Sequence, residues 1–104
     1  MKLMKKKIRI QKDKIKEFCK KHHIQRLAMY GSVLRSDFAR ESDIDLLVEF
    51  EAGHTPGFFK LFEMEEELSG LFGGHKVDLR TPQDLSQYFR DKVIQSAEVQ
   101  YVQG

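Results

Sequence analysis

Residues 43–50, DIDLLVEF, constrain the fold more than any other stretch of the chain. Their apolar residues recur at every second position, which is typical of a strand with one buried face. Asp43 and Asp45 are two residues apart, so on a strand their carboxylates leave the same face. Two carboxylates this close disfavour each other's ionisation, and a cation between them would remove that cost. The buried face is expected to hold Ile44, Leu46, Val48 and Phe50, and the other face Asp43, Asp45, Leu47 and Glu49.

Hydrophobic spacing and turn residues divide the rest of the chain into alternating helices and strands. This order predicts an α/β fold, α+β-like in detail, in which helices pack on a small mixed β-sheet. The tail from residue 98 is expected either to form an edge strand or to fray. Helices are expected at about residues 10–22, 33–39, 58–72 and 82–93, and strands at 24–30, 43–50 and 75–80.

Three helices carry specific expectations. Ser32 is expected to act as the N-cap of the short second helix, directly after Gly31. The last helix is expected to begin with Thr81 as N-cap, followed by Pro82 and by Asp84 in the first turn. Its buried side should be Leu85, Tyr88, Phe89 and Val93. The third helix should bury a core stripe of Phe58, Leu61, Phe62, Met64, Leu68, Leu71 and Phe72.

A third acid and a Gly-Ser pair extend the pattern of the two aspartates. Asp78 lies within the short strand 75–80, and if that strand neighbours residues 43–50, three carboxylates gather. Carboxylate oxygens without Cys or His ligands favour a hard cation such as Mg²⁺. Glycine lets a phosphate approach the main chain, and the helix start after it offers free N–H groups. Gly31 and Ser32 are therefore candidate phosphate-binding residues, and Arg35 is a candidate partner for the same anion.

The segment GSVLRSDFARESDIDLLVEF resembles the signature of polymerase-beta-type nucleotidyltransferases. In length and arrangement the chain is similar to the minimal nucleotidyltransferases, the antitoxins of HEPN–MNT toxin–antitoxin pairs. This resemblance implies a palm-like core in which Gly31 and Ser32 hold ATP phosphates. Asp43 and Asp45 would bind Mg²⁺, and Asp78 would complete the metal-binding and catalytic triad. It also implies that AMP is transferred from ATP to a tyrosine hydroxyl of a partner HEPN ribonuclease toxin, in a hetero-oligomer with that toxin.

Other interpretations stay open at this point. The chain could be an antitoxin that neutralises its toxin by stoichiometric binding, with a vestigial nucleotide site. Transfer to RNA or to a small molecule is less favoured, because so small a chain has little surface for such an acceptor. Asp43 alone reads as a turn residue, and Asp78 as an edge-strand acid paired with Lys76 or Arg80. His22, His23, His54 and His75 are expected to be surface or boundary residues rather than ligands.

Composition narrows the class of protein. The 104 residues predict one domain, residues 1–104, and 40% hydrophobic with 33% charged residues is ordinary for a globular protein. The sequence contains no apolar run long enough for a membrane span. The single cysteine, Cys19, fits the reducing cytoplasm. Residues 1–26 hold eleven Lys and Arg, but a solvated basic face is the commoner reason for such a run, so direct nucleic-acid binding is not expected.

Overall fold

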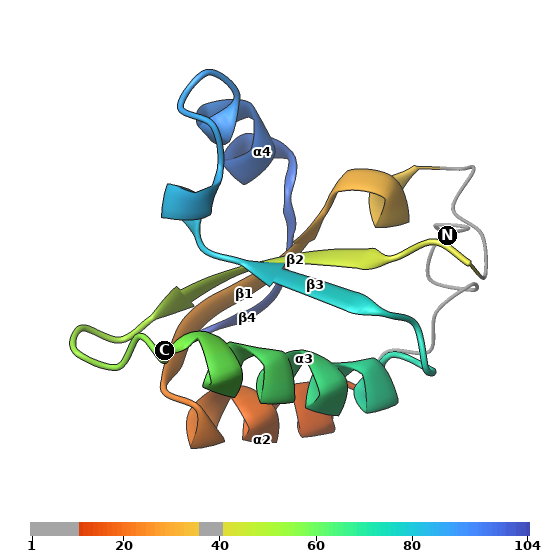
Figure 1. Ribbon diagram of the computed structural model, residues 1–104, viewed down its shortest axis with the longest axis vertical. Helices are drawn as coiled ribbons and strands as arrows, with labels where there is room; N and C mark the ends of the chain where they lie inside the picture. The colour runs from red at the N-terminus through yellow and green to blue at the C-terminus, as the bar shows by residue number, and fades with distance from the viewer. Residues whose placement is uncertain (1–10, 36–40) are drawn as a thin grey trace.

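The computed structural model describes residues 11–35 and 41–104, which form a mixed four-stranded sheet with helices on both faces (Figure 1). The strand order is β3-β2-β1-β4. β1 (Ile24–Tyr30) pairs antiparallel with β2 (Ile44–Phe50) and with β4 (Glu98–Val102), while β3 (Val77–Arg80) pairs parallel with β2. The expected mixed sheet is confirmed, and the tail forms the edge strand β4.

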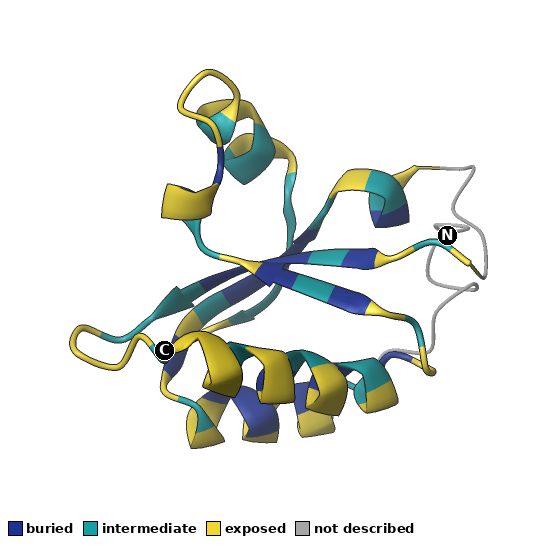
Figure 2. Ribbon diagram, viewed as in Figure 1, coloured by how far each residue is buried: buried dark blue, intermediate teal, exposed yellow. Residues whose placement is uncertain are grey.

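Two long helices cover one face of this sheet. α2 (Lys12–Lys21) and α3 (Phe58–Leu71) lie side by side below the strands, as Figure 1 shows. Figure 2 shows that the sides of both helices turned to the sheet hold their buried residues. Between the helices and the strands lies the main core, to which β2 contributes the predicted alternate residues Ile44, Leu46 and Val48. The core cluster also holds Ile15, Phe18, Cys19, Ile24, Leu27, Met29, Val33, Met64, Leu68, Phe72, Val77 and Leu79.

The aromatic residues at the start of α3 correct one prediction. Phe58 and Phe62 are 80% and 56% exposed, so they are not core residues, whereas Met64, Leu68 and Phe72 are buried as predicted. The helix has apolar residues around too much of its circumference for all of them to face the sheet. Phe59, which lies edge-on to Phe58 with ring centroids 5.8 Å apart, is also exposed.

The predicted last helix is the second correction. Thr81, Pro82 and Asp84 do form a helix start with a capping box, but it opens a 3₁₀ turn, η2 (Pro82–Asp84), that ends at Leu85. The α-helix α4 (Arg90–Ser96) begins five residues later. Its first residue, Arg90, donates from its guanidinium to the main-chain oxygens of Pro82 (2.7 Å) and Leu85 (2.9 Å), which fixes α4 to the 3₁₀ turn.

Because the chain is not helical between these two elements, two predicted core residues lie outside the core. Tyr88 is 88% exposed and Phe89 is 50% exposed. Leu85 is buried as predicted, and Val93 is partly buried. Among the described residues, no helix is both long and apolar enough to cross a bilayer.

The two ends of α3 give a stability prediction. Phe72→Ala removes a fully buried ring, and a cavity of that size should lower the free energy of unfolding by about 3–5 kcal/mol. Phe59→Ala removes the same ring from a position that is 81% exposed and should change stability by less than about 0.5 kcal/mol. Urea unfolding of both variants measures the difference, and equal losses would contradict the packing described above.

Candidate active site

Strand pairing brings the predicted acids together on the sheet face opposite α2 and α3. Asp45, the second residue of β2, is the direct partner of Asp78 on the parallel strand β3 and of Tyr30 on the antiparallel strand β1. Asp43 is exposed and lies just before β2 begins at Ile44. The site is therefore built where β1 ends and β2 begins.

Asp45 is the electrostatic centre of this group. Burial raises the pKa of its carboxyl above the ordinary value, and the neighbouring carboxylates of Asp78 and Asp43 raise it further. Arg80 and a hydrogen bond from the main-chain N–H of Ser32 act in the opposite direction. The raised pKa means that the negative charge gathered here is only partly compensated.

The turn at Gly31 lies close against Asp45. The φ of Gly31 is +76°, a conformation that glycine adopts at little cost, and the chain turns there from β1 into the 3₁₀ helix η1 (Gly31–Leu34). A Cβ at this position would lie 2.6 Å from Oδ2 of Asp45, closer than any side chain could be accommodated without a shift. The main chain of this turn thus lies directly against the central carboxylate.

Ser32 differs from its predicted role. It is not an N-cap, because η1 starts at Gly31 and Ser32 lies inside this 3₁₀ turn. The N-cap residue of η1 is Tyr30. The Ser32 hydroxyl donates instead to the main-chain oxygen of Asp43, 3.3 Å away. Arg35 follows η1, is exposed, and donates its main-chain N–H to the oxygen of Ser32 (3.0 Å). The rest of the predicted second helix, residues 36–39, lies outside the described residues.

Asp78 has a partner within its own strand. Nε of Arg80 donates to Oδ2 of Asp78 at 3.1 Å, as expected if Asp78 were an edge-strand acid. Asp78 thus has the partner expected of an edge-strand acid and also lies opposite Asp45 in the strand pair, while its catalytic role stays a prediction. β3 is held at this edge by α3, since Oε2 of Glu65 accepts the main-chain N–H of Leu79 at 2.8 Å.

Two residues of the site were not among the predicted set. Arg80 was expected only as a possible partner of Asp78, although its position two residues later on the same strand face also brings it to the site. Tyr30 borders Asp45, and the pKa of its phenol is raised by burial first and by the charge of Asp45 second. No sequence signal would have found Tyr30, because its position depends on the register between β1 and β2.

The donor set fits a hard divalent cation. Three carboxylates with oxygen ligands alone suit Mg²⁺. Burial first, and then the like charges of Asp78 and Asp43, raise the pKa of Asp45, as expected where carboxylates gather. Within residues 11–35 and 41–104, these aspartates are not among the groups whose ligand atoms all lie within 4.8 Å of one another. Oδ2 of Asp78 is paired with Nε of Arg80 instead, at 3.1 Å.

A family model described as "Nucleotidyltransferase domain" matches residues 12–100 of the chain. The protein adenylyltransferase MntA of Thermococcus cleftensis is 33% identical over 87 residues, which cover 84% of this chain and 83% of that protein. A Methanocaldococcus jannaschii protein, "Putative protein adenylyltransferase MJ0128", is 46% identical over 59 residues. That match covers 57% of each of the two chains.

Solved structures share the fold. A toxin–antitoxin structure with AMP-PNP superposes with a TM-score of 0.70 at 20% identity, over 90% of this chain and 75% of that one. A chain of the structure described as tri-AMPylated Shewanella oneidensis HEPN toxin in complex with MNT antitoxin superposes with a TM-score of 0.62 at 19% identity. That superposition covers 88% of this chain and 70% of the other.

The contact between Gly31 and Asp45 predicts a specific non-additivity. Gly31→Ala should cost about 1–2 kcal/mol for its left-handed φ, and more if its Cβ moves the Asp45 carboxylate off its hydrogen bond with the main-chain N–H of Ser32. Gly53 has a similar φ (+80°), but a Cβ there would have nothing within 4 Å. Gly53→Ala should therefore cost only the conformational free energy of the left-handed φ. In an Asp45→Ala background the excess cost of Gly31→Ala should vanish. Equal costs at both glycines in chemical denaturation would contradict the contact.

The electrostatics of Asp45 predict a pH-dependent stability. Because the pKa of Asp45 is raised in the folded protein, ionisation of this carboxyl lowers the free energy of unfolding. The stabilising contribution of the protonated carboxyl is fully present below the pKa of the unfolded state and is lost as the pH rises through the pKa of the folded state. Asp45→Asn should therefore stabilise the protein at neutral pH without divalent ions, and the gain should disappear in acid. The exposed Asp91→Asn on α4 controls for the chemical change. A gain for Asp45→Asn that persists at low pH would argue against this origin.

Proposed function

Since this chain belongs to the nucleotidyltransferase domain family, we propose that it transfers AMP from ATP to a tyrosine hydroxyl of a HEPN toxin that it also binds. The relatives named protein adenylyltransferases support AMP transfer to protein. The toxin–antitoxin complexes that share the fold, one with AMP-PNP and one with a tri-AMPylated HEPN toxin, support ATP as donor and the toxin as acceptor.

The single observation that carries the proposal is the meeting of Gly31, Asp45 and Asp78. A turn that only glycine fits easily lies against one carboxylate, and strand register places the second carboxylate opposite it. A purely structural turn would not require two acids on adjacent strands at its contact point. A site that binds a cation and a triphosphate requires both features.

Each residue has a role in this reaction. Gly31 would allow the triphosphate to approach the main chain, and the Ser32 hydroxyl would donate to a phosphate oxygen in place of the main-chain oxygen of Asp43. Asp43 and Asp45 would hold Mg²⁺, which when bound neutralises charge on the triphosphate. Asp78 would accept the proton of the attacking hydroxyl as that oxygen bonds to the α-phosphorus. The bond from the α-phosphorus to the bridging oxygen then breaks, and pyrophosphate leaves.

The two arginines would pair with different anionic groups, Arg80 with the Asp78 carboxylate and Arg35 with a phosphate. Nε of Arg80 donates to Oδ2 of Asp78 and so helps to hold that carboxylate in position. Arg35, which is exposed directly after η1, would pair with a phosphate of the nucleotide. We assign the reaction to the cytoplasm, where a free thiol such as that of Cys19 persists.

A second candidate function is neutralisation by binding alone. The exposed aromatic residues of α3 favour it, because Phe58, Phe59 and Phe62 offer apolar surface without any need for catalysis. The two functions differ in what the aspartates do, so substitution of the aspartates separates them.

Asp45→Asn and Asp78→Asn should fail in different ways. With ATP, Mg²⁺ and the cognate HEPN toxin, Asp45→Asn should abolish AMP addition and weaken nucleotide binding. Asp78→Asn should keep much of the nucleotide binding and slow transfer by about 10²- to 10⁴-fold, the usual value of general-base catalysis. Intact mass spectrometry of the toxin measures transfer, and calorimetry measures ATP binding.

The matched control is Asp91→Asn, which makes the same chemical change at an exposed position of α4 and should transfer AMP at the wild-type rate. If the wild type adds no AMP yet neutralises the toxin, and a variant with Asn at 43, 45 and 78 neutralises it equally well, the binding function replaces the enzymatic one.

A further inference from the structure

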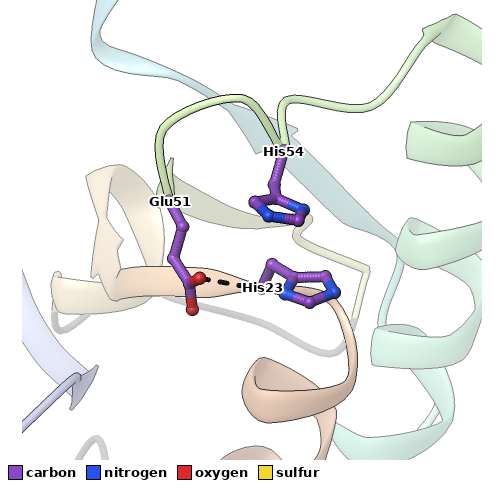
Figure 3. A group of neighbouring side chains, drawn as sticks. All are labelled: His23, Glu51 and His54. Atoms are coloured by element: carbon purple, nitrogen blue, oxygen red, sulfur yellow. Dashed lines mark ion pairs between the residues drawn. The ribbon is translucent and has the colours of Figure 1, made fainter.

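A second cluster of metal-binding side chains lies at the other end of the β1–β2 pair. His23, Glu51 and His54 each offer a ligand atom, and these three atoms all lie within 4.8 Å of one another. Figure 3 shows the two imidazole rings stacked, with the Glu51 carboxylate beside them. The ring centroids are 3.9 Å apart, and Nδ1 of His23 is 3.8 Å from Oε1 of Glu51.

Main-chain hydrogen bonds hold the three residues in position. The N–H of Glu51 donates to the oxygen of His23, and the N–H of His54 donates to the oxygen of Glu51, both at 2.9 Å. His23 is the non-glycine residue with a positive φ (57°) among those the structure describes. His23 lies in the turn between α2 and β1, and its side chain lies next to Glu51 and His54 in the loop after β2. The cluster is fixed by the backbone and not only by chance contacts of mobile side chains.

Glu51 is oriented by a partner from the end of the chain. Nε2 of Gln103 donates to Oε2 of Glu51 at 2.7 Å, which leaves Oε1 directed at His23. Outer hydrogen bonds of this kind commonly orient carboxylate ligands in metal sites. The side chains of His23 and Glu51 are 52% and 33% exposed, so water and ions reach them.

We propose that His23, Glu51 and His54 bind a divalent transition-metal ion, and we take Zn²⁺ as the ion with which to test this. Two imidazoles and one carboxylate are the donors that such ions prefer, whereas Mg²⁺ and Ca²⁺ prefer oxygen alone. Three protein ligands leave a fourth position of the tetrahedral ion for water. The exposed rings unstack on binding, which lets one nitrogen of each turn to the ion.

The site is separate from the nucleotidyltransferase site. Ile24 pairs with Phe50 beside the cluster, and Tyr30 pairs with Asp45 at the other end of the same strand pair. Six residues of extended chain separate the two ends by roughly 20 Å. An ion here would touch no residue assigned to AMP transfer. It would join the α2–β1 turn to the β2–α3 loop and stabilise the folded chain by mass action.

The test is calorimetric titration of the full chain with Zn²⁺, in excess Mg²⁺ so that oxygen-only sites are filled. Wild type should bind one ion per chain, and its melting temperature should rise with Zn²⁺. His23→Asn, in which asparagine tolerates the positive φ, and His54→Gln should each bind at least about 10-fold more weakly and lose the rise. Melting without Zn²⁺ checks that each variant folds.

The matched control is His22→Gln. His22 neighbours His23 but pairs with Glu67 on α3 (Nε2 to Oε1, 3.1 Å), so its loss should leave Zn²⁺ affinity unchanged. The proposal is overturned if wild type does not bind Zn²⁺, or if the His23 and His54 variants bind it as tightly as wild type. Neither outcome depends on ATP, the toxin or the aspartates, so failure here is distinguishable from failure of the proposed function.

Discussion

The pairing of β1 with β2 is the interaction on which the candidate site depends. It places Tyr30 opposite Asp45, so the next residue, Gly31, turns the chain directly over the carboxylate. Ile44 and Leu46 are fully buried between the sheet and the helices α2 and α3, and their burial holds this register. A slip of one residue would move Asp45 into the core and an apolar neighbour to the site, so hydrophobic burial and site geometry are specified together.

The site concentrates negative charge that the protein alone compensates only in part. Asp45 is partly buried among two further carboxylates, and Arg80 is drawn toward Asp78. Such an arrangement lowers the stability of the free protein and is understandable where a cation and an anionic substrate complete it. The cluster of His23, Glu51 and His54 has different donor chemistry and lies at the far end of the same strands. One strand pair thus presents an oxygen-only group and a nitrogen-rich group at its two ends.

Much of this arrangement was predictable where local sequence determines it. The alternation in residues 43–50 predicted β2 and its faces. Asp78 was expected to meet Asp45 only if the two strands were neighbours, and the pairing of β3 with β2 meets that condition. The prediction failed where tertiary packing decides. Phe58 and Phe62 look like core residues at helical spacing, but the sheet is covered by the other side of α3. The capping box at Thr81 begins a 3₁₀ turn instead of a long helix, and Arg90, the first residue of the later α-helix, donates to the main-chain oxygen of Pro82. Tyr30 and the His23 cluster depend on pairing between distant residues, which no local pattern encodes.

The central claim is that Gly31, Asp43, Asp45 and Asp78 form one site for a divalent ion and a nucleotide. Amide NMR spectra of the 104-residue chain, recorded with ATP and small additions of Mn²⁺ in place of Mg²⁺, test it most directly. The account predicts paramagnetic broadening at residues 31–32, 43–45 and 78 that Asp45→Asn abolishes, whereas any broadening at His23 and His54 should remain in that variant. Broadening that leaves these residues sharp, or that persists at them in Asp45→Asn, would contradict it.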